Sequence, residues 1–436
     1  MELKKFKLGD CLELQRGYDL TSSQMQKGEV AVVGSNGIIG YHDTPRGNSP
    51  CITVGRSGSV GKVHYYERPT WAHNTALFVK DFKGNDPKYL YYYLKNLHLD
   101  NMFEKGSSVI PSLDRKVVHS LVVPFHKDRN DQRKIATILS AIDKKIELNR
   151  QINDNLEAMA KQLYDYWFVQ FDFPNEEGKP YKSSGGAMVW NEKLKREIPT
   201  SFDVKSLSEI IEVKDGTHDS PKPQDNGYFL LTSKHLTERG LDYASAYKIS
   251  KEDYESINKR SKVDTNDILF SMIGTIGNSY FVEETNINFA IKNMALFKTS
   301  AKRWFSEYLY LYLSSCDYKH YEGNSLSGSI QKFVSLRTLR DMPILYHEDI
   351  IKVFAKEVRN IITMMVNLRK ENIELTKQRD ELLPLLMNGQ ASVNYHLTVL
   401  FITKIMLYYK ETNINFRYER NNNTKRFRWN ESGSVS

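Results

Sequence analysis

The hydrophobic positions of the chain form two long helical patterns, each of which follows a stretch of shorter, mixed patterns. Between Arg129 and Phe168 there is neither Gly nor Pro, and apolar residues recur at alternating steps of three and four. That spacing is the periodicity of a coiled-coil seam. The same frame returns 219 residues later, from Val358 to Leu386. The pattern therefore predicts two long helices, one central and one late in the chain.

Twelve positions are expected on the apolar seam of these helices. Asn153 and Asn372 occupy the same frame position, so we expect them to face each other across antiparallel helices or to lie near their shared axis, where an Asn pair fixes register. Pro384 is expected to kink the second helix or to end it near Leu383, with Gly389 as terminator. The predicted seam comprises Leu139, Ile142, Ile146, Asn153, Leu156 and Leu163, followed by Val358, Ile361, Met365, Asn372, Leu375 and Leu382.

Four short blocks occur twice in the same order, with offsets that grow from 199 to 219 residues. A period of this length indicates two copies of a domain and is far too long for a solenoid repeat. The growing offset indicates that the second copy carries insertions in its early loops. The matching blocks are Leu8–Gly17 with Leu207–Gly216, Gly58–Gly61 with Gly274–Gly277, Asn74–Phe78 with Asn293–Phe297, and Tyr89–Leu94 with Tyr308–Leu313.

These patterns predict an α+β chain with an internal pseudo-twofold repeat. Two tandem mixed α/β domains are expected, separated by two long antiparallel coiled-coil-like helices. The stretch between the first helix and the second domain contains Pro, Gly and Ser, so we interpret it as a linker. The expected segments are 1–126 for the first domain, 127–172 for the central helix, 173–200 for the linker, 201–346 for the second domain, 347–392 for the C-terminal helix and 393–436 for a non-core tail.

The charge of the chain is unevenly distributed. Its net charge is +8, yet residues 393–436 alone hold seven basic and three acidic residues. The remaining body is only mildly basic, unlike a protein that coats DNA without regard to sequence. The three cysteines lie far apart and form no C-x-x-C pair, which argues against a zinc ribbon or a disulfide framework and favours the cytoplasm. No apolar run is long enough to span a membrane.

None of the catalytic motifs we sought meets its spacing requirement. Gly55–Lys62 is similar to a phosphate-binding loop, but five residues separate its glycines and Val63 follows the lysine. A glycine-containing hairpin or bulge is therefore favoured, with nucleotide binding and close backbone approach to DNA as alternatives. The sequence has no H-E-x-x-H, no G-x-S-x-G and no Pro-Pro dipeptide, which an adenine-methylating loop would need. We expect no catalytic site, cofactor or metal.

A tandem pair of unlike domains, each followed by a long helix, resembles the specificity subunit of type I restriction–modification systems. The resemblance covers about residues 1–392, and it rests on the order and duplication of its segments. Those segments are Tyr18, Val33–Tyr41, Gln132–Ala136, Asp215–Pro221, Leu231–Lys234, Asp267–Gly277 and Leu382–Gly389.

The resemblance implies a division of labour. Each target-recognition domain would read one half of a split, asymmetric site in a major groove of double-stranded DNA. The paired helices would act as a spacer and dock two methyltransferase subunits, and motor–nuclease subunits would join for cleavage. A helix of about 40 residues spans roughly 60 Å, enough to bridge grooves about 34 Å apart. Two alternatives stay open: a structural adaptor without sequence preference, and a stand-alone restriction enzyme with an unrecognised catalytic site.

Polar side chains on loops at matching places in the two copies are the candidate base readers. Asn74 and Asn293 also fit a scaffold residue that both copies share, because base readers should differ between copies. His218 also fits a local turn, and the Tyr clusters at 89–93 and 308–312 fit the core better than a stacking platform. The DNA-binding candidates are Ser35, Asn36, Arg56, Ser57, His73 and Asn74 in the first copy, and Thr217, His218, Ser233, Lys234, Thr275 and Asn293 in the second.

Overall fold

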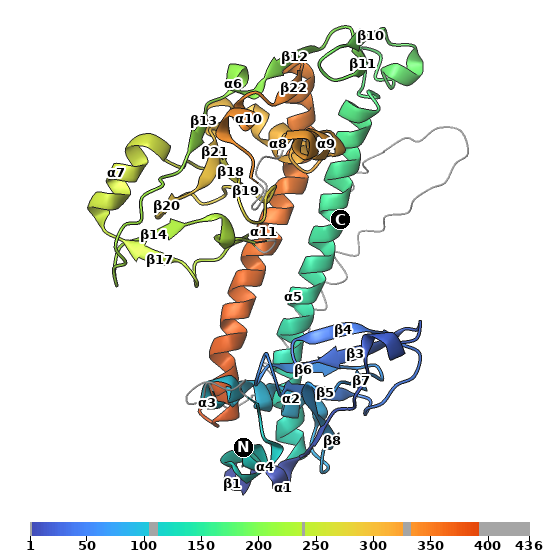
Figure 1. The fold of residues 1–436 in the computed structure, drawn as a ribbon, viewed down its shortest axis with the longest axis vertical. Helices are drawn as coiled ribbons and strands as arrows, with labels where there is room; N and C mark the ends of the chain where they lie inside the picture. The colour runs from blue at the N-terminus through green and yellow to red at the C-terminus, as the bar shows by residue number, and fades with distance from the viewer. Residues whose placement is uncertain (1, 104–111, 238–239, 326–332, 392–436) are drawn as a thin grey trace, which may run out of the picture. The chain divides into compact units, whose positions relative to one another are not determined.

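The computed structural model describes residues 2–103, 112–237, 240–325 and 333–391. It contains both helices and sheets, as expected for the fold class. The chain divides into two compact units (Figure 1). Unit 1 combines residues up to 145 with the chain from residue 376, and unit 2 comprises residues 146–375. Each long helix passes from one unit into the other, so the division falls inside the helices and not at their ends.

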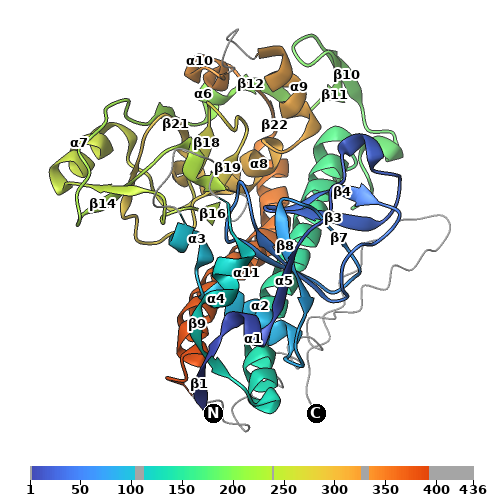
Figure 2. The same ribbon diagram turned by 60° about the horizontal axis from the view of Figure 1, so that its bottom comes forward.

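The described strands of unit 1 form three sheets. The largest is antiparallel with the strand order β2-β8-β5-β6, and a smaller sheet has the order β4-β3-β7 (Figure 2). In the smaller sheet β3 pairs antiparallel with β4 and parallel with β7. The strands are β1 (Leu3–Lys7), which pairs with β9 (Val122–His126), β2 (Glu13–Arg16), β3 (Val30–Gly34), β4 (Gly37–His42), β5 (Cys51–Gly55), β6 (Val63–Tyr66), β7 (Trp71–Ala72) and β8 (Ala76–Asp81).

The core of unit 1 lies between its four-stranded sheet and its helices. Helix α2 begins where the Asp86 side chain accepts a hydrogen bond from the Tyr89 amide and Pro87 occupies the first turn, a strong start signal. Tyr89 and Tyr93 are buried in this core, consistent with the preferred interpretation of the Tyr cluster. The helices are α1 (Leu8–Cys11), α2 (Pro87–Asn96), α3 (Leu99–Phe103), α4 (Arg115–Ser120) and the 3₁₀ turn Ser22–Gln24.

Unit 2 has strand orders that correspond to those of unit 1. Its four-stranded sheet runs β13-β21-β18-β19 and its three-stranded sheet runs β17-β14-β20, where β14 pairs antiparallel with β17 and parallel with β20. The strands are β10 (Met188–Asn191), β11 (Arg196–Pro199), β12 (Asp203–Ser206), β13 (Val213–Asp215), β14 (Tyr228–Leu231), β15 (Leu236–Thr237), β16 (Gly240–Leu241), β17 (Tyr247–Ile249), β18 (Ile268–Ser271), β19 (Ser279–Phe281), β20 (Phe289–Ile291), β21 (Met294–Phe297) and β22 (Pro343–Tyr346).

A helix between β17 and β18 accounts for part of the larger repeat offset in the second copy. Helix α7 packs on the three-stranded sheet, where Ile257 is buried together with Leu230 and Ile249. The helices of unit 2, besides the long ones, are α6 (Leu207–Ile210), α7 (Lys251–Ser261), α8 (Arg303–Tyr312), α9 (Cys316–Ser325), α10 (Leu336–Arg340) and the 3₁₀ turns Lys182–Ser184, Ser233–His235 and Thr299–Lys302.

The part of the chain that the structure describes has two long helices. They are α5 (Arg129–Tyr164), which continues into a π-helical turn at Asp165–Val169, and α11 (Glu348–Met387). In unit 2 they run antiparallel, because Asn149 contacts Asn372 whereas Tyr164 contacts Phe354. In unit 1 Arg379 of α11 forms an ion pair with Asp143 of α5 at 2.9 Å. Among the helices of the described ranges, none combines the length and apolarity that a bilayer crossing requires.

The predicted seam positions all lie on the protected side of the two helices. Six are buried and six are half-buried. The buried residues are Leu139, Ile142, Ile146, Val358, Ile361 and Met365, and the half-buried residues are Asn153, Leu156, Leu163, Asn372, Leu375 and Leu382.

The structure adds detail to the helix prediction at two points. Asn372 hydrogen-bonds to Asn149, one turn before Asn153. Of the two outcomes expected at Pro384, an end near Leu383 is excluded, because α11 continues through Pro384 to Met387. Proline there removes only one helical hydrogen bond close to the end of the helix, while buried Leu386 and Met387 hold the last turn in the core. Gly389 then takes a left-handed conformation at φ +66°, as a terminating glycine does.

The segment expected to be a linker is folded. Residues 188–199 form the antiparallel hairpin of β10 and β11. Phe173 and Ile198, inside the same segment, are buried in the core of unit 2 with Phe202. Aromatic side chains that a Pro- and Gly-containing stretch carries can still be buried when tertiary contacts cover them. The expected tail at 393–436 lies outside the described residues.

Candidate DNA interface

Thr75 joins three of the predicted loop residues of unit 1. Its carbonyl oxygen accepts hydrogen bonds from the amides of Arg56 at 2.9 Å and Ser57 at 3.1 Å. Its hydroxyl oxygen accepts from the Ser35 amide at 3.3 Å. One residue that the prediction omitted therefore holds the β3–β4 and β5–β6 loops beside the start of β8. The sequence did point to Thr75, because this residue lies in the repeated block Asn74–Phe78.

His73 has a supporting role. Its Nε2 lies 3.2 Å from the Leu20 carbonyl oxygen, which can only accept, so Nε2 carries the proton. Its Nδ1 then accepts from the Thr75 hydroxyl at 3.0 Å. Both ring nitrogens are engaged inside the unit, and the ring holds the loop in place with no nitrogen left to donate to or accept from a base.

The Gly55–Lys62 segment forms a turn between β5 and β6. The Gly55 amide donates to the Lys62 carbonyl at 2.7 Å, and the Gly61 amide donates to the Gly55 carbonyl at 2.9 Å. Gly61 is required here, because it has φ +77° and an added Cβ would stand 2.2 Å from the Asp100 amide nitrogen. This geometry agrees with the favoured hairpin. At its end Lys62 donates to Asn36 Oδ1 at 2.7 Å, so exposed Asn36 is tied to an exposed lysine.

Asn74 contacts a residue that the prediction missed. Its Nδ2 donates to Asp19 Oδ1, and Arg16 lies 3.6 Å from the same carboxylate. The Asp19 side chain is 80% exposed. Asp19 directly follows Tyr18, which the sequence had placed before a loop, but nothing in the local pattern distinguished it.

In unit 2 four of the six predicted residues come together. Asn293 lies at φ +54°, and its amide donates to the Thr217 carbonyl at 3.1 Å. Its carbonyl oxygen accepts from the Ser233 hydroxyl at 3.2 Å. Its side-chain Oδ1 lies 2.8 Å from His218 Nδ1. Largely buried Asp215, absent from the prediction, holds the other nitrogen of His218, with Nε2 2.9 Å from Oδ2.

The remaining two candidates of unit 2 are exposed. Lys234 lies in the 3₁₀ turn after β14, and Thr275 lies in the turn between Gly274 and Gly277. That turn matches the one in unit 1, since Gly274 and Gly277 have φ +79° and +88°, close to +80° and +77° for Gly58 and Gly61. Thr275 thus corresponds to a turn position at which no candidate was named in the first copy.

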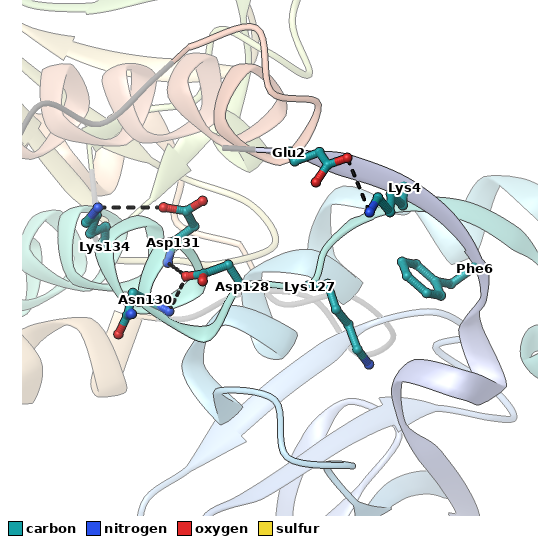
Figure 3. A pocket seen from close by; sticks show the side chains of 8 residues that line it. All are labelled: Glu2, Lys4, Phe6, Lys127, Asp128, Asn130, Asp131 and Lys134. Atoms are coloured by element: carbon teal, nitrogen blue, oxygen red, sulfur yellow. Dashed lines mark hydrogen bonds and ion pairs between the residues drawn. The ribbon is translucent and has the colours of Figure 1, made fainter.

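A surface hollow of about 550 Å³ lies in unit 1 at the start of α5 (Figure 3). Three lysines and three acidic residues line it, and its charges are partly paired within the hollow, as between Lys134 and Asp131 at 3.6 Å. Asp128 caps the helix by accepting from the amides of Asn130 and Asp131. This mixed charge does not favour an anionic ligand. Within the described ranges, no group of three or more potential metal ligands is placed to hold an ion.

Comparisons with known proteins agree with the resemblance seen in the sequence. The family model described as the type I restriction modification DNA specificity domain matches residues 1–158. The type I restriction enzyme MjaIX specificity subunit of Methanocaldococcus jannaschii is 27% identical over 323 residues, covering 70% of this chain and 69% of the relative. The HindI specificity subunit of Haemophilus influenzae is 24% identical over 353 residues, covering 66% and 72%.

A solved structure shares the fold. The crystal structure of a type I restriction–modification system S subunit from M. genitalium has a TM-score of 0.55 at 17% identity, and the match covers 88% of this chain and 96% of that one. In its sequence the chain is thus similar to the specificity subunits of type I restriction–modification systems, and its residues 1–158 match the family model of the type I DNA specificity domain.

Proposed function

We propose that this chain is the sequence-specific DNA-recognition subunit of a type I restriction–modification complex. Units 1 and 2 each read one half of a bipartite, asymmetric site in double-stranded DNA. The observation that carries the proposal is the pair of corresponding sheets, whose loops present different side chains at equivalent positions.

Backbone hydrogen bonds define those equivalent positions. The Tyr18 amide donates to the Ala72 carbonyl, and the Thr217 amide donates to the Ile291 carbonyl. Tyr18 also bridges His73, as Thr217 bridges Lys292. The backbone hydrogen-bonding pattern is therefore the same at the two equivalent positions.

The side chains at those positions differ. Tyr18 corresponds to Thr217, and Asp19 corresponds to His218. Two readers with one scaffold and unlike polar groups suit a site whose halves differ in sequence. This difference between the side chains of the two units supports an asymmetric target site over a palindromic one.

The helices α5 and α11 are proposed to act as the spacer and as the docking surface for two methyltransferase subunits, with motor–nuclease subunits joining for cleavage. Two apolar side chains of α11, Val353 and Met364, are 49% and 47% exposed. They are eleven residues apart, which is close to three helical turns, so they lie on one face. Exposed polar residues such as Glu357 and Asn360 share this face, so Val353 and Met364 are two apolar contacts that we propose for a methyltransferase subunit.

In such a complex this subunit would act by positioning its partner subunits on the DNA. The chain alone is expected to have neither methyltransferase nor nuclease activity, and its contribution is to choose which adenines its partners reach. We propose a cytoplasmic location, where such complexes meet DNA.

Mapping methylated adenines tests the proposal. Cells would express the chain with the methyltransferase subunit of its own system, and their DNA would be compared with DNA from cells that lack the chain. A split motif that depends on the chain is expected. Replacing residues 1–126 with the equivalent segment of another specificity subunit should change one half of that motif.

The other outcomes discriminate the alternatives. Methylation without sequence preference would favour a structural adaptor. Methylation or cleavage by the highly purified chain alone would favour a stand-alone enzyme. If both halves of the motif changed after the replacement, the two units would not be independent readers.

A further inference from the structure

Asn74 and Asn293 are the same residue type at the same place in the two units, but their side chains have different partners. The match is set by the backbone, since each follows the residue bridged to Tyr18 or Thr217. Both asparagines are half-buried, and each hydrogen bond lies at the surface.

In unit 1 the partner of the asparagine, Asp19, is a hydrogen-bond acceptor. A carboxylate such as Asp19 has no proton to donate, so it orients the Asn74 amide nitrogen toward itself. The carbonyl oxygen of Asn74 is then the part of the amide turned away from Asp19. In the major groove that oxygen can accept from an amino group, which adenine and cytosine present there.

In unit 2 the partner of the asparagine donates. Both nitrogens of His218 face oxygen atoms, Asp215 Oδ2 at 2.9 Å and Asn293 Oδ1 at 2.8 Å. The Asn293 oxygen can only accept, so Nδ1 of His218 donates to it. The Asn293 oxygen is thus occupied, and its amino group is the part turned away from His218. That group can donate to guanine O6 or thymine O4.

We infer that Asp19 and His218 are specificity-determining residues, which set opposite hydrogen-bond polarity on one shared asparagine. Unit 1 presents an acceptor that selects an amino-bearing base, and unit 2 presents a donor that selects a keto-bearing base. The asparagine belongs to the common scaffold, and the residue beside it carries the difference between the two half-sites. This inference rests on the proposed function.

The test is to exchange the partners and map the methylated motif. The variant His218→Asp gives unit 2 the partner found in unit 1. We expect one position of the second half-site to change from guanine or thymine to adenine or cytosine, with a roughly tenfold change in preference, while the first half-site stays the same. Asp19→Asn, which keeps the shape and removes the carboxylate, should relax one position of the first half-site only.

Lys222→Ala is the matched control, because Lys222 is an exposed residue of the same loop. Loss of a phosphate contact there would weaken methylation at all sites and leave the motif unchanged. Both test positions are exposed, and equal thermal unfolding of variant and wild type confirms folding.

The outcomes separate the two claims. Absence of a split motif in the wild type would overturn the proposed function and this inference with it. A wild-type motif that His218→Asp and Asp19→Asn leave unchanged would overturn the inference alone. So would a folded His218→Asp variant that loses methylation at every sequence.

Discussion

Asn149 Nδ2 of α5 donates a hydrogen bond to Asn372 Oδ1 of α11 at 3.0 Å, and it also donates to Glu371 Oε2 at 2.7 Å. Asn149 is fully buried. The heptad frame had matched Asn372 with Asn153, because it compared two copies along the sequence. In an antiparallel pair, residues meet in opposite order, so the contact depends on the helix register and the copy alignment cannot predict it.

A double-mutant cycle at Asn149 and Asn372 should show a strong coupling. Asn149→Leu alone removes the buried donor from two acceptors and is expected to lower the free energy of unfolding by about 1–3 kcal/mol. Adding Asn372→Leu should recover much of that loss, because two leucines can pack at the seam. Chemical denaturation of the four proteins measures the cycle. Additive effects of the two substitutions would contradict the contact.

Glu283 should make stability depend on pH. It lies at the end of the β18–β19 hairpin with a side chain only 6% exposed, 3.5 Å from Arg369 of α11. Burial outweighs the attraction of Arg369 and raises the pKa of Glu283 to about 7. The folded state therefore binds this proton more tightly than the unfolded state does.

The stabilisation that this proton provides is complete below pH 4.5 and is lost as the pH rises through about 7. We expect the free energy of unfolding to fall over this window by on the order of 2 kcal/mol more in the wild type than in Glu283→Gln. Urea denaturation at several pH values measures the difference. Exposed Glu176→Gln serves as control and should follow the wild type. Parallel curves for wild type and Glu283→Gln would show that Glu283 is not the titrating group.

The three thiols should differ sharply in reactivity. Cys11 and Cys51 are fully buried, and burial raises the pKa of Cys11 to about 11 and also raises that of Cys51. Cys316, at the start of α9, is exposed. Because the thiolate is the reactive form, a thiol reagent should label one cysteine quickly in the native protein and three after denaturation. Cys316→Ser should abolish the fast reaction, and a fast reaction that persisted in this variant would refute the assignment.

Insertions in the long helices test their proposed role as a spacer. Four residues added after Arg150, matched by four after Glu371, would lengthen the pair by about 6 Å, near two base pairs of DNA. We expect the unread gap of the methylated motif to grow by one or two base pairs, with weaker assembly because the seam shifts phase.

Seven matched residues keep the heptad but add about 10 Å, or roughly three base pairs, and rotate the second groove by about 100°. This larger insertion should impair recognition. Four residues added to the turn between β10 and β11 are the control and should leave the gap unchanged. An active helix-insertion variant with the original gap would exclude the spacer role.

Several features of this protein follow from its sequence alone. The three- and four-residue steps after Arg129 and up to Leu386 predicted both long helices and their protected side, since helical periodicity is a local property. The repeated blocks identified corresponding elements, and the spacing of Gly55–Lys62 favoured a turn over a nucleotide site. The helix and turn inferences depend on residues that are near one another in the chain, and the repeat depends on comparing short local blocks.

Other features were decided only by tertiary structure, because they depend on contacts between distant segments. Phe173 packs against Phe202, which lies beyond the Pro- and Gly-containing stretch, so the stretch expected to be a linker is folded. Helix α11 passes Pro384 because the core holds its last turn. The orientation of the Asn74 side-chain amide is set by Asp19, 55 residues earlier. That of the Asn293 amide is set by His218, 75 residues earlier. A pattern predicts which face of an element is buried, but only packing determines which side chain lies opposite.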